Sequence, residues 1–357
     1  MGETFIVSGA NPPAPDLERW FSMIFKLFAR RLCAALGLAC AVVTPVLAAP
    51  PAGEVVVVLN SGDASITLID KATQALVASY PVGKEPHHLM ATPDARSLIV
   101  ANAVGNDLVL IDPLTGKLQQ RMPQIDDPYQ IGFSPDQKWF VSNALRLDRV
   151  DIYRATFDDK TRSLKLTAQV PLPKTPSHMT FSADSRLVFI TLQDSNEIAA
   201  IDLATHAVLW KMPVGNAPAG IWMTPDDKYL LVGMTGDDYV EVIDWRQRKS
   251  VKRIPSGKGA HNFRPLGDRR HVFVTNRVSS TISIIDQVKL EKVGEITGLP
   301  PGPDCMELTA DGKQLWVTFR WARKVGIIDV ASRKLIKTIP VGRSPHGIYF
   351  HTRAPLI

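Results

Sequence analysis

Histidines recur at related places along the chain and are its most distinctive chemical feature. His87, His178, His261 and His346 each lie just after the start of a similar segment, and His88 follows the first of them. Imidazole binds transition metals, ligates haem iron or acts as a general base near neutral pH. If the fold brings these segments together, His87, His178, His261 and His346 are candidate metal ligands.

The equivalent segments without this histidine carry Tyr129, Ala219 or the pair Asp304 and Cys305. A carboxylate and a thiol among imidazoles add two further candidate ligands. The alternative is that Pro-His belongs to the repeat itself, so that each ring hydrogen-bonds a neighbouring segment. Repetition favours this alternative, because a metal needs a few ligands in one place, about 2.1 Å from the ion, and opposite repeats are expected to lie too far apart.

Asparagines and arginines follow an apolar strand in several segments: Asn60, Asn102, Asn143, Asn276, Arg146, Arg277, Arg320 and Arg323. Guanidinium groups suit carboxylates, phosphates or an acidic partner surface. Arg277 and Arg264, together with the segment 320–324, would form a basic sector, and Trp321 within that segment is typical of a contact patch. The alternative for these arginines is ordinary solvated loop charge.

A unit of about 42 residues positions these side chains. It begins at Pro86, Pro128, Pro176, Pro218, Ala260, Pro303 and Pro345, with spacings of 42, 48, 42, 42, 43 and 42 residues. Each unit contains short apolar, β-rich runs separated by turn residues, and four such strands per unit predict a propeller blade. The long spacing places an insertion at 155–163, in the hairpin between a third and a fourth strand. The Asp residues that end most third strands are expected to accept backbone N–H groups in the next turn.

The two ends of the array complement each other. Residues 55–83 supply three strands and residues 344–350 supply one, so together they complete a single blade. Closing a ring in this way protects strand edges. The sequence therefore predicts an all-β, seven-bladed propeller of four-stranded blades, closed by pairing of the N- and C-terminal strands. In such blades the Pro-His segments and the ends of the second strands share one mouth of the central funnel.

The candidate ligand-binding residues at this mouth are His87, His88, Tyr129, His178, His261, Asp304, His346, Asn102, Asn276, Arg277, Arg320 and Arg323.

The repeat resembles the YVTN-type β-propeller family, through motifs such as FSPDQKWFVSN, VFVTN, TIPVG and SPHGIYF. The resemblance spans nearly all of residues 55–350. It implies a seven-bladed exported propeller, similar to bacterial periplasmic members of this group. Several members are binding or scaffold proteins, and distant relatives carry haem or partner quinoprotein dehydrogenases, so the resemblance leaves the activity open.

The N-terminal region has the composition of a targeting segment. Residues 23–48 combine a basic flank, an apolar run at 32–43 and small residues before Ala49, which predicts a signal peptide. Residues 1–22 would then be an upstream extension, and 49–357 a single propeller domain in the periplasm or secreted. The apolar run is shorter than the ~20 residues of a membrane span. Lipoprotein processing at Cys40 is the less favoured alternative.

The composition and the absence of several catalytic motifs limit which functions the sequence can support. The chain has 357 residues, a net charge of +6 and 45% hydrophobic residues, which fits a globular protein and gives no support for nucleic-acid binding. It contains no GxSxG, Walker, Rossmann, CxxCH or HExxH motif. We therefore expect a monomeric, exported, non-enzymatic binding or scaffold propeller that holds a small ligand or a periplasmic protein partner. The alternative is a metal- or haem-binding redox accessory protein, or a funnel enzyme that uses the mouth histidines; lactone hydrolysis is a weaker option. No cofactor is assigned, and a transition metal or haem stays open.

Overall fold

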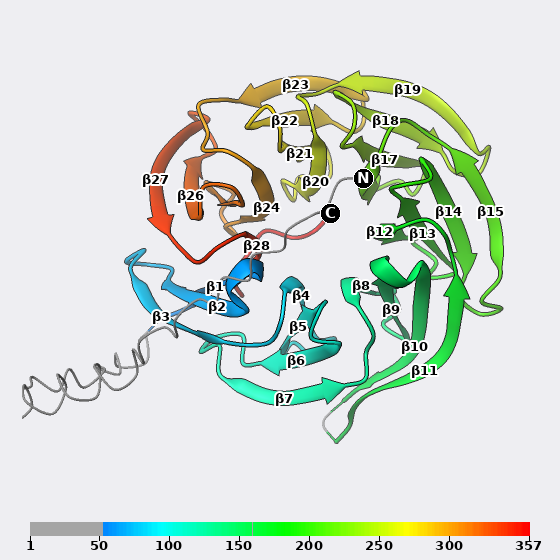
Figure 1. Ribbon diagram of the computed structural model, residues 1–357. Helices are drawn as coiled ribbons and strands as arrows, with labels where there is room; N and C mark the ends of the chain where they lie inside the picture. Colours follow the sequence, from blue (N-terminus) through cyan, green and yellow to red (C-terminus); the bar gives the residue numbers. More distant parts are fainter. Residues whose placement is uncertain (1–52, 159) are drawn as a thin grey trace, which may run out of the picture. The chain divides into compact units, whose positions relative to one another are not determined.

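The structure is a computed structural model that describes residues 53–158 and 160–357. The predicted extension 1–22 and signal peptide 23–48 lie outside the described residues. The described residues form seven antiparallel sheets of four strands each, arranged around a common axis (Figure 1). Within these residues there is no helix with the length and apolar character needed to cross a membrane.

Two strands of each blade lie nearest the axis. The innermost strands are β28 (Pro345–Tyr349), β4 (Pro86–Ala91), β8 (Pro128–Phe133), β12 (Pro176–Phe181), β16 (Pro218–Met223), β20 (Ala260–Pro265) and β24 (Pro303–Leu308). The second strands are β1 (Val55–Asn60), β5 (Leu98–Asn102), β9 (Trp139–Ala144), β13 (Leu187–Leu192), β17 (Tyr229–Met234), β21 (His271–Asn276) and β25 (Gln314–Phe319). We call the end of the propeller where innermost strands begin and second strands end the mouth.

The other strands complete each blade outward. The third strands are β2 (Ser65–Asp70), β6 (Asp107–Ile111), β10 (Arg149–Phe157), β14 (Glu197–Asp202), β18 (Tyr239–Asp244), β22 (Thr281–Asp286) and β26 (Lys324–Asp329). The outer strands are β3 (Leu76–Pro81), β7 (Leu118–Pro123), β11 (Arg162–Pro171), β15 (Val208–Pro213), β19 (Lys249–Pro255), β23 (Glu291–Ile296) and β27 (Lys334–Pro340). Two 3-10 turns, η1 (Ser61–Asp63) and η2 (Leu145–Leu147), follow second strands.

The predicted closure of the ring is confirmed. β28 pairs antiparallel with β1, with Val58 opposite Ile348. Alternate residues of β1 face opposite neighbours, as the two-residue period of a strand requires. Val57 packs with the blade that contains Val100, whereas Val58 packs with the blade that contains Trp316. The split blade is therefore joined to both neighbours by continuous apolar packing.

The remaining strand predictions also hold. The insertion lengthens the hairpin between β10 and β11, which pair from Arg149–Pro171 out to Phe157–Arg162. The Asp residues that end third strands accept backbone N–H groups of the following turn: Asp70, Asp112, Asp202, Asp244, Asp286 and Asp329. Second strands are buried on both faces, whereas outer strands are largely exposed, so the apolar core lies between neighbouring blades.

Candidate functional site

A bulge at the start of the innermost strands places two side chains of a strand near the axis. In β4, Pro86 pairs with Asn102 and Leu89 pairs with Val100, so His87 and His88 together oppose one residue of β5. The same interruption follows the first residue of β12, β16, β20 and β24. A bulge re-aims side chains and is common beside functional sites. The second and third residues of these strands therefore face their counterparts from other blades.

Four histidines and one aspartate form a closed ring of neighbours, which we call the axial cluster: His346, His88, His178, His261 and Asp304. The ring centroids are separated by 4.8 Å from His346 to His88, 5.7 Å from His88 to His178 and 4.8 Å from His178 to His261. The carboxylate of Asp304 lies 3.3 Å from His261 Nδ1 and 3.6 Å from His346 Nε2. Histidine rings of four blades are therefore in contact with their neighbours, while each group of described residues whose ligand atoms all lie within 4.8 Å of one another comes from two blades.

His87 and Tyr129 extend the axial cluster on one side. The His87 ring stacks on His346 with a centroid separation of 3.7 Å and lies 4.1 Å from the ring of Tyr129. His87 and His346 both occupy the second position of their strands, as does His261, whereas His178 occupies the third position, like His88. His178 therefore lies one position further along its strand than the second-position histidines do.

The cluster histidines are neutral at neutral pH. Burial lowers the pKa of His88 and of His261 to about 4, and Arg277 adds to the effect at His261. Burial also holds the pKa values of His178 and His346 well below the ordinary value. A neutral imidazole has one N–H donor and one free lone pair, so these rings can act as ligands without first losing a proton.

Hydrogen bonds fix the orientation of three of these rings. His346 Nδ1 donates to the carbonyl of His87 at 2.6 Å, and His88 Nδ1 donates to the carbonyl of Tyr129 at 2.7 Å. These bonds join neighbouring blades, so the predicted latch between segments is confirmed for both rings. His178 Nδ1 pairs with the hydroxyl of Ser177 at 2.7 Å. In all three rings, the Nε2 atom is buried and has no hydrogen-bond partner.

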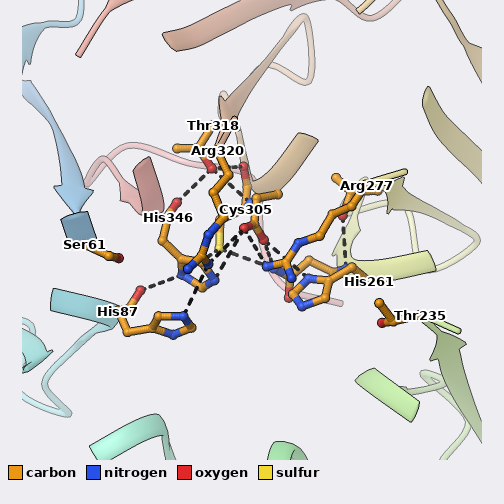
Figure 2. A network of polar contacts seen from close by, with 12 residues as sticks. Ser61, His87, Thr235, His261, Arg277, Cys305, Thr318, Arg320 and His346 are labelled. Carbon is orange, nitrogen blue, oxygen red and sulfur yellow. Dashed lines mark hydrogen bonds and ion pairs between the residues drawn. The ribbon is translucent and has the colours of Figure 1, made fainter. Parts of the chain in front are cut away.

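Two arginines and two histidines surround the carboxylate of Asp304. Burial alone would raise its pKa, but Arg277 at 2.6 Å and the adjacent histidines hold the pKa of this carboxyl well below its usual range. Arg320 approaches the same carboxylate at 3.6 Å and His87 Nε2 at 3.5 Å. Figure 2 shows Arg277 and Arg320 entering the same network of contacts from two blades. Two guanidinium groups against one carboxylate leave the cluster with one excess positive charge.

Cys305 lies next to the carboxylate and is half-buried. Its Sγ atom is 3.6 Å from His346 Nδ1 and accepts a hydrogen bond from Asn262 Nδ2 at 3.3 Å. Asn262 Nδ2 also donates to Asp304 at 3.0 Å. Burial raises the pKa of the Cys305 thiol, so the group is a neutral thiol at pH 7.

The other predicted site residues lie away from the axial cluster. Asn102 and Asn276 are fully buried. The Asn102 amide donates to Asp107 and to the carbonyl of Val82 in the preceding crossover, and the Asn276 amide donates to Thr281 within its own blade. Arg323 is exposed at the rim. The asparagines therefore shape the ends of their strands, and a ligand at the mouth would meet Arg323 before it met them.

The prediction for Arg264 is wrong. This residue lies at the far end of β20 from the mouth, where it is buried and pairs with Glu307 at 2.7 Å. It also donates to the carbonyl of Ala354 at 2.6 Å, and so binds the C-terminal segment. Arg264 follows the bulge of its innermost strand by two residues and therefore lies toward the end of the blade opposite the mouth. Its distance in sequence from the start of the unit could have predicted this.

Sequence reasoning missed a set of hydroxyl contacts between blades. Ser61 Oγ donates to the carbonyl of Pro86 at 2.7 Å, and Thr318 Oγ1 donates to the carbonyl of His346 at 2.8 Å. Thr235 makes the same kind of contact with Ala260 at 3.1 Å. Figure 2 shows these hydroxyl groups around the histidines. Serine or threonine near the end of a second strand was the sequence feature that could have predicted these contacts.

A cavity opens at the mouth next to Arg320. It has a volume of about 330 Å³ and is lined by Ser61, Gly62, Ala64, Lys84, Glu85, Val104, Arg320 and Ser344. The volume is within the range of small-molecule sites. Trp321, beside Arg320, is 56% exposed, so an aromatic face is available at the same rim.

Two curated proteins and one solved structure show where the chain's similarities lie. Protein NirF of Stutzerimonas stutzeri is 25% identical over 196 residues, which cover 40% of this chain and 50% of that protein. Protein NirF of Pseudomonas aeruginosa is 24% identical over 261 residues, which cover 54% of this chain and 66% of that protein. The matched region is thus between half and two thirds of the length of these relatives.

The structure of the dihydro-heme d1 dehydrogenase NirN in complex with DHE has the same fold, with a TM-score of 0.61 and 17% identity. The match covers 85% of this chain and 75% of that chain. The family comparison covers much more of the sequence, from residue 11 to residue 356. On this match, and in agreement with the seven-bladed fold, the chain belongs to the YNCE-like beta-propeller family.

Proposed function

We propose that the protein is an exported binding propeller that holds a small anionic ligand at its mouth. One observation carries the proposal: Arg277 and Arg320 converge on a single carboxylate, Asp304, among neutral imidazoles. The excess positive charge is partly buried, where an anion interacts more strongly than in water. A carboxylate or phosphate of the ligand would pair with these guanidinium groups through charge-assisted hydrogen bonds.

A tetrapyrrole with carboxylate side chains is the ligand class that we favour. NirN, which shares the fold, is a dihydro-heme d1 dehydrogenase that was solved in complex with DHE. The residues of this chain fit the carboxylates of such a group, because Arg277 and Arg320 present guanidinium donors at the mouth. The cluster rings contact one another, so we place the macrocycle at the mouth, beside Arg320 and the exposed face of Trp321.

Titration of the purified protein with protoporphyrin IX tests this proposal, and the quenching of tryptophan fluorescence reports binding. The iron-free macrocycle isolates the carboxylate contacts from any bond to a metal. Arg320→Ala should weaken binding by about tenfold, the effect of losing one charge-assisted contact of roughly 1.5 kcal/mol. Arg320 makes the longer contact with Asp304, so its removal leaves the 2.6 Å pair of Arg277 intact.

Arg270→Ala is the matched control, because Arg270 pairs with Asp286 away from the mouth. This variant should bind protoporphyrin IX like the wild type. Absence of binding by the wild type, or equal affinities for the wild type and Arg320→Ala, would overturn the proposal.

A further inference from the structure

Three histidines of the axial cluster share an arrangement that the anion proposal does not use. In His88, His178 and His346, Nδ1 is held by a hydrogen bond of 2.7, 2.7 and 2.6 Å. For His88 and His346 the acceptor is a backbone carbonyl, which requires the proton to be on Nδ1. The lone pair is then on Nε2, the atom that is buried without a partner in all three rings.

A buried polar atom without a partner is costly, and each one in a native fold calls for an explanation. Histidines that ligate metals almost always donate their other ring N–H to a carbonyl, carboxylate or water, which fixes the tautomer and the direction of the free nitrogen. His88 and His346 already donate Nδ1–H to such a carbonyl. Three such nitrogens, one from each of three blades, lie around one axis. The inter-blade latch does not explain their unpartnered state, because the latch uses only Nδ1.

His88 and His346 already lie close enough together for one ion, whereas the ring of His178 has to move toward them. Ring nitrogens of His88 and His346 lie within 4.8 Å of each other, in a group that also includes His87. The ring of His178 contacts that of His88 at 5.7 Å between centroids. Asp304 supplies a carboxylate oxygen 3.6 Å from His346 Nε2, about the distance between two ligands of a tetrahedral ion with bonds of ~2.1 Å.

The charge around the axial cluster limits which ions can bind. Arg277 and Arg320 oppose a cation, and Asp304 offsets only one of them. Hard ions such as calcium and magnesium need several oxygen ligands, which this set does not offer among the described residues. Late first-row ions form strong bonds to neutral imidazole, and these can overcome the opposing charge.

We propose that His88, His178 and His346 bind one divalent transition-metal ion of the cobalt-to-zinc series through Nε2, with Asp304 as the adjacent carboxylate. This site goes beyond the proposed function, because the protein's own side chains hold the ion and no tetrapyrrole is needed. A metal at this position would satisfy the unpartnered nitrogens and tie three blades together.

Titration of the purified, untagged protein with Co²⁺ after chelator treatment tests the site. The wild type should bind one Co²⁺ per chain with the visible absorption of a low-coordinate ion, and Zn²⁺ should displace it. His178→Ala and His346→Ala should each weaken Co²⁺ binding by at least roughly tenfold. His178→Gln keeps a polar side chain of similar length and is therefore less liable to disturb the fold. This variant should also fail to bind the ion.

His271→Ala is the control, because His271 pairs with Asp268 outside the axial cluster. It should bind Co²⁺ like the wild type. The metal proposal is overturned if the wild type binds no Co²⁺, or if the His178 variants bind it normally. Protoporphyrin IX separates the two proposals, since His178→Ala should bind it normally and Arg320→Ala should still bind Co²⁺.

Discussion

The two ring nitrogens of a mouth histidine have different surroundings, and this difference governs what each residue can do. In His346, Nδ1 joins two blades and Nε2 faces Asp304. The recurrence of histidine at one end of the fold followed from the sequence, because the repeat gives every segment the same place in its blade. The contacts between rings did not follow, since the bulge that turns both His87 and His88 inward has no clear sequence signal.

Glycine at the third position of an innermost strand is a further residue-scale requirement of the axial cluster. A Cβ atom on Gly220 would lie 1.6 Å from the carbonyl oxygen of His261, which is backbone and cannot move aside easily. Gly220→Ala should therefore destabilise the protein by roughly 3 kcal/mol, as overpacking does. Thermal unfolding measures the effect.

Gly53→Ala is the matched substitution, because the nearest atom to its added Cβ would be 3.9 Å away. It should leave the melting temperature nearly unchanged. Equal melting temperatures for the two variants would show that neighbouring blades can separate at β16 and β20 without cost.

The third strand of most blades ends in a turn that the sequence predicts. Asp202 closes β14, and its carboxylate accepts N–H groups of Ala204 at 3.0 Å and Thr205 at 2.9 Å. These turns were predictable because an Asp at the end of a strand accepts backbone N–H groups two or three residues further on. The length of the hairpin at 155–163 was predictable as well, from the longer spacing of its unit. Packing between blades required the three-dimensional arrangement.

The turn carboxylates make stability depend on pH. Burial would raise the pKa of Asp202, but hydrogen bonds from Thr205 and Arg186 lower it below the ordinary 3.8. The unfolded chain then takes up the proton first, so the contribution to stability is complete above about pH 4 and is lost as the pH falls through the folded-state pKa. Asp202→Asn should cost about 1 kcal/mol at pH 7 and less near pH 3.

Urea unfolding of Asp202→Asn and the wild type at both pH values measures this difference. A gap between the two proteins that stays constant from pH 7 to pH 3 would show that the carboxylate charge contributes nothing to the stability of the turn.

At the scale of the whole propeller, closure by β28 and β1 was the most secure prediction, because three strands at one end of the chain and one at the other complete a single blade. The separation of side chains across the axis was the least secure. It depends on how closely the blades pack, and a repeat pattern does not record this. The same limit explains Arg264, whose burial with Glu307 depends on the C-terminal segment that crosses the end of β20.

Closure also explains how one mouth can combine groups from distant parts of the sequence. His346 and His87 are separated by most of the chain, yet their rings stack at 3.7 Å because β28 and β4 belong to neighbouring blades. Arg277 and Arg320 reach the same carboxylate from consecutive blades. The ligand site is therefore a property of the closed ring, and no single repeat contains it.

A crystal structure of the full protein grown with protoporphyrin IX would show directly whether the mouth is the ligand site. We predict a macrocycle at the mouth, with a carboxylate within hydrogen-bond distance of Arg277 or Arg320 and one face near Trp321. A macrocycle bound to the outer strands, or a mouth that stays empty while the porphyrin is bound elsewhere, would contradict the proposed ligand site.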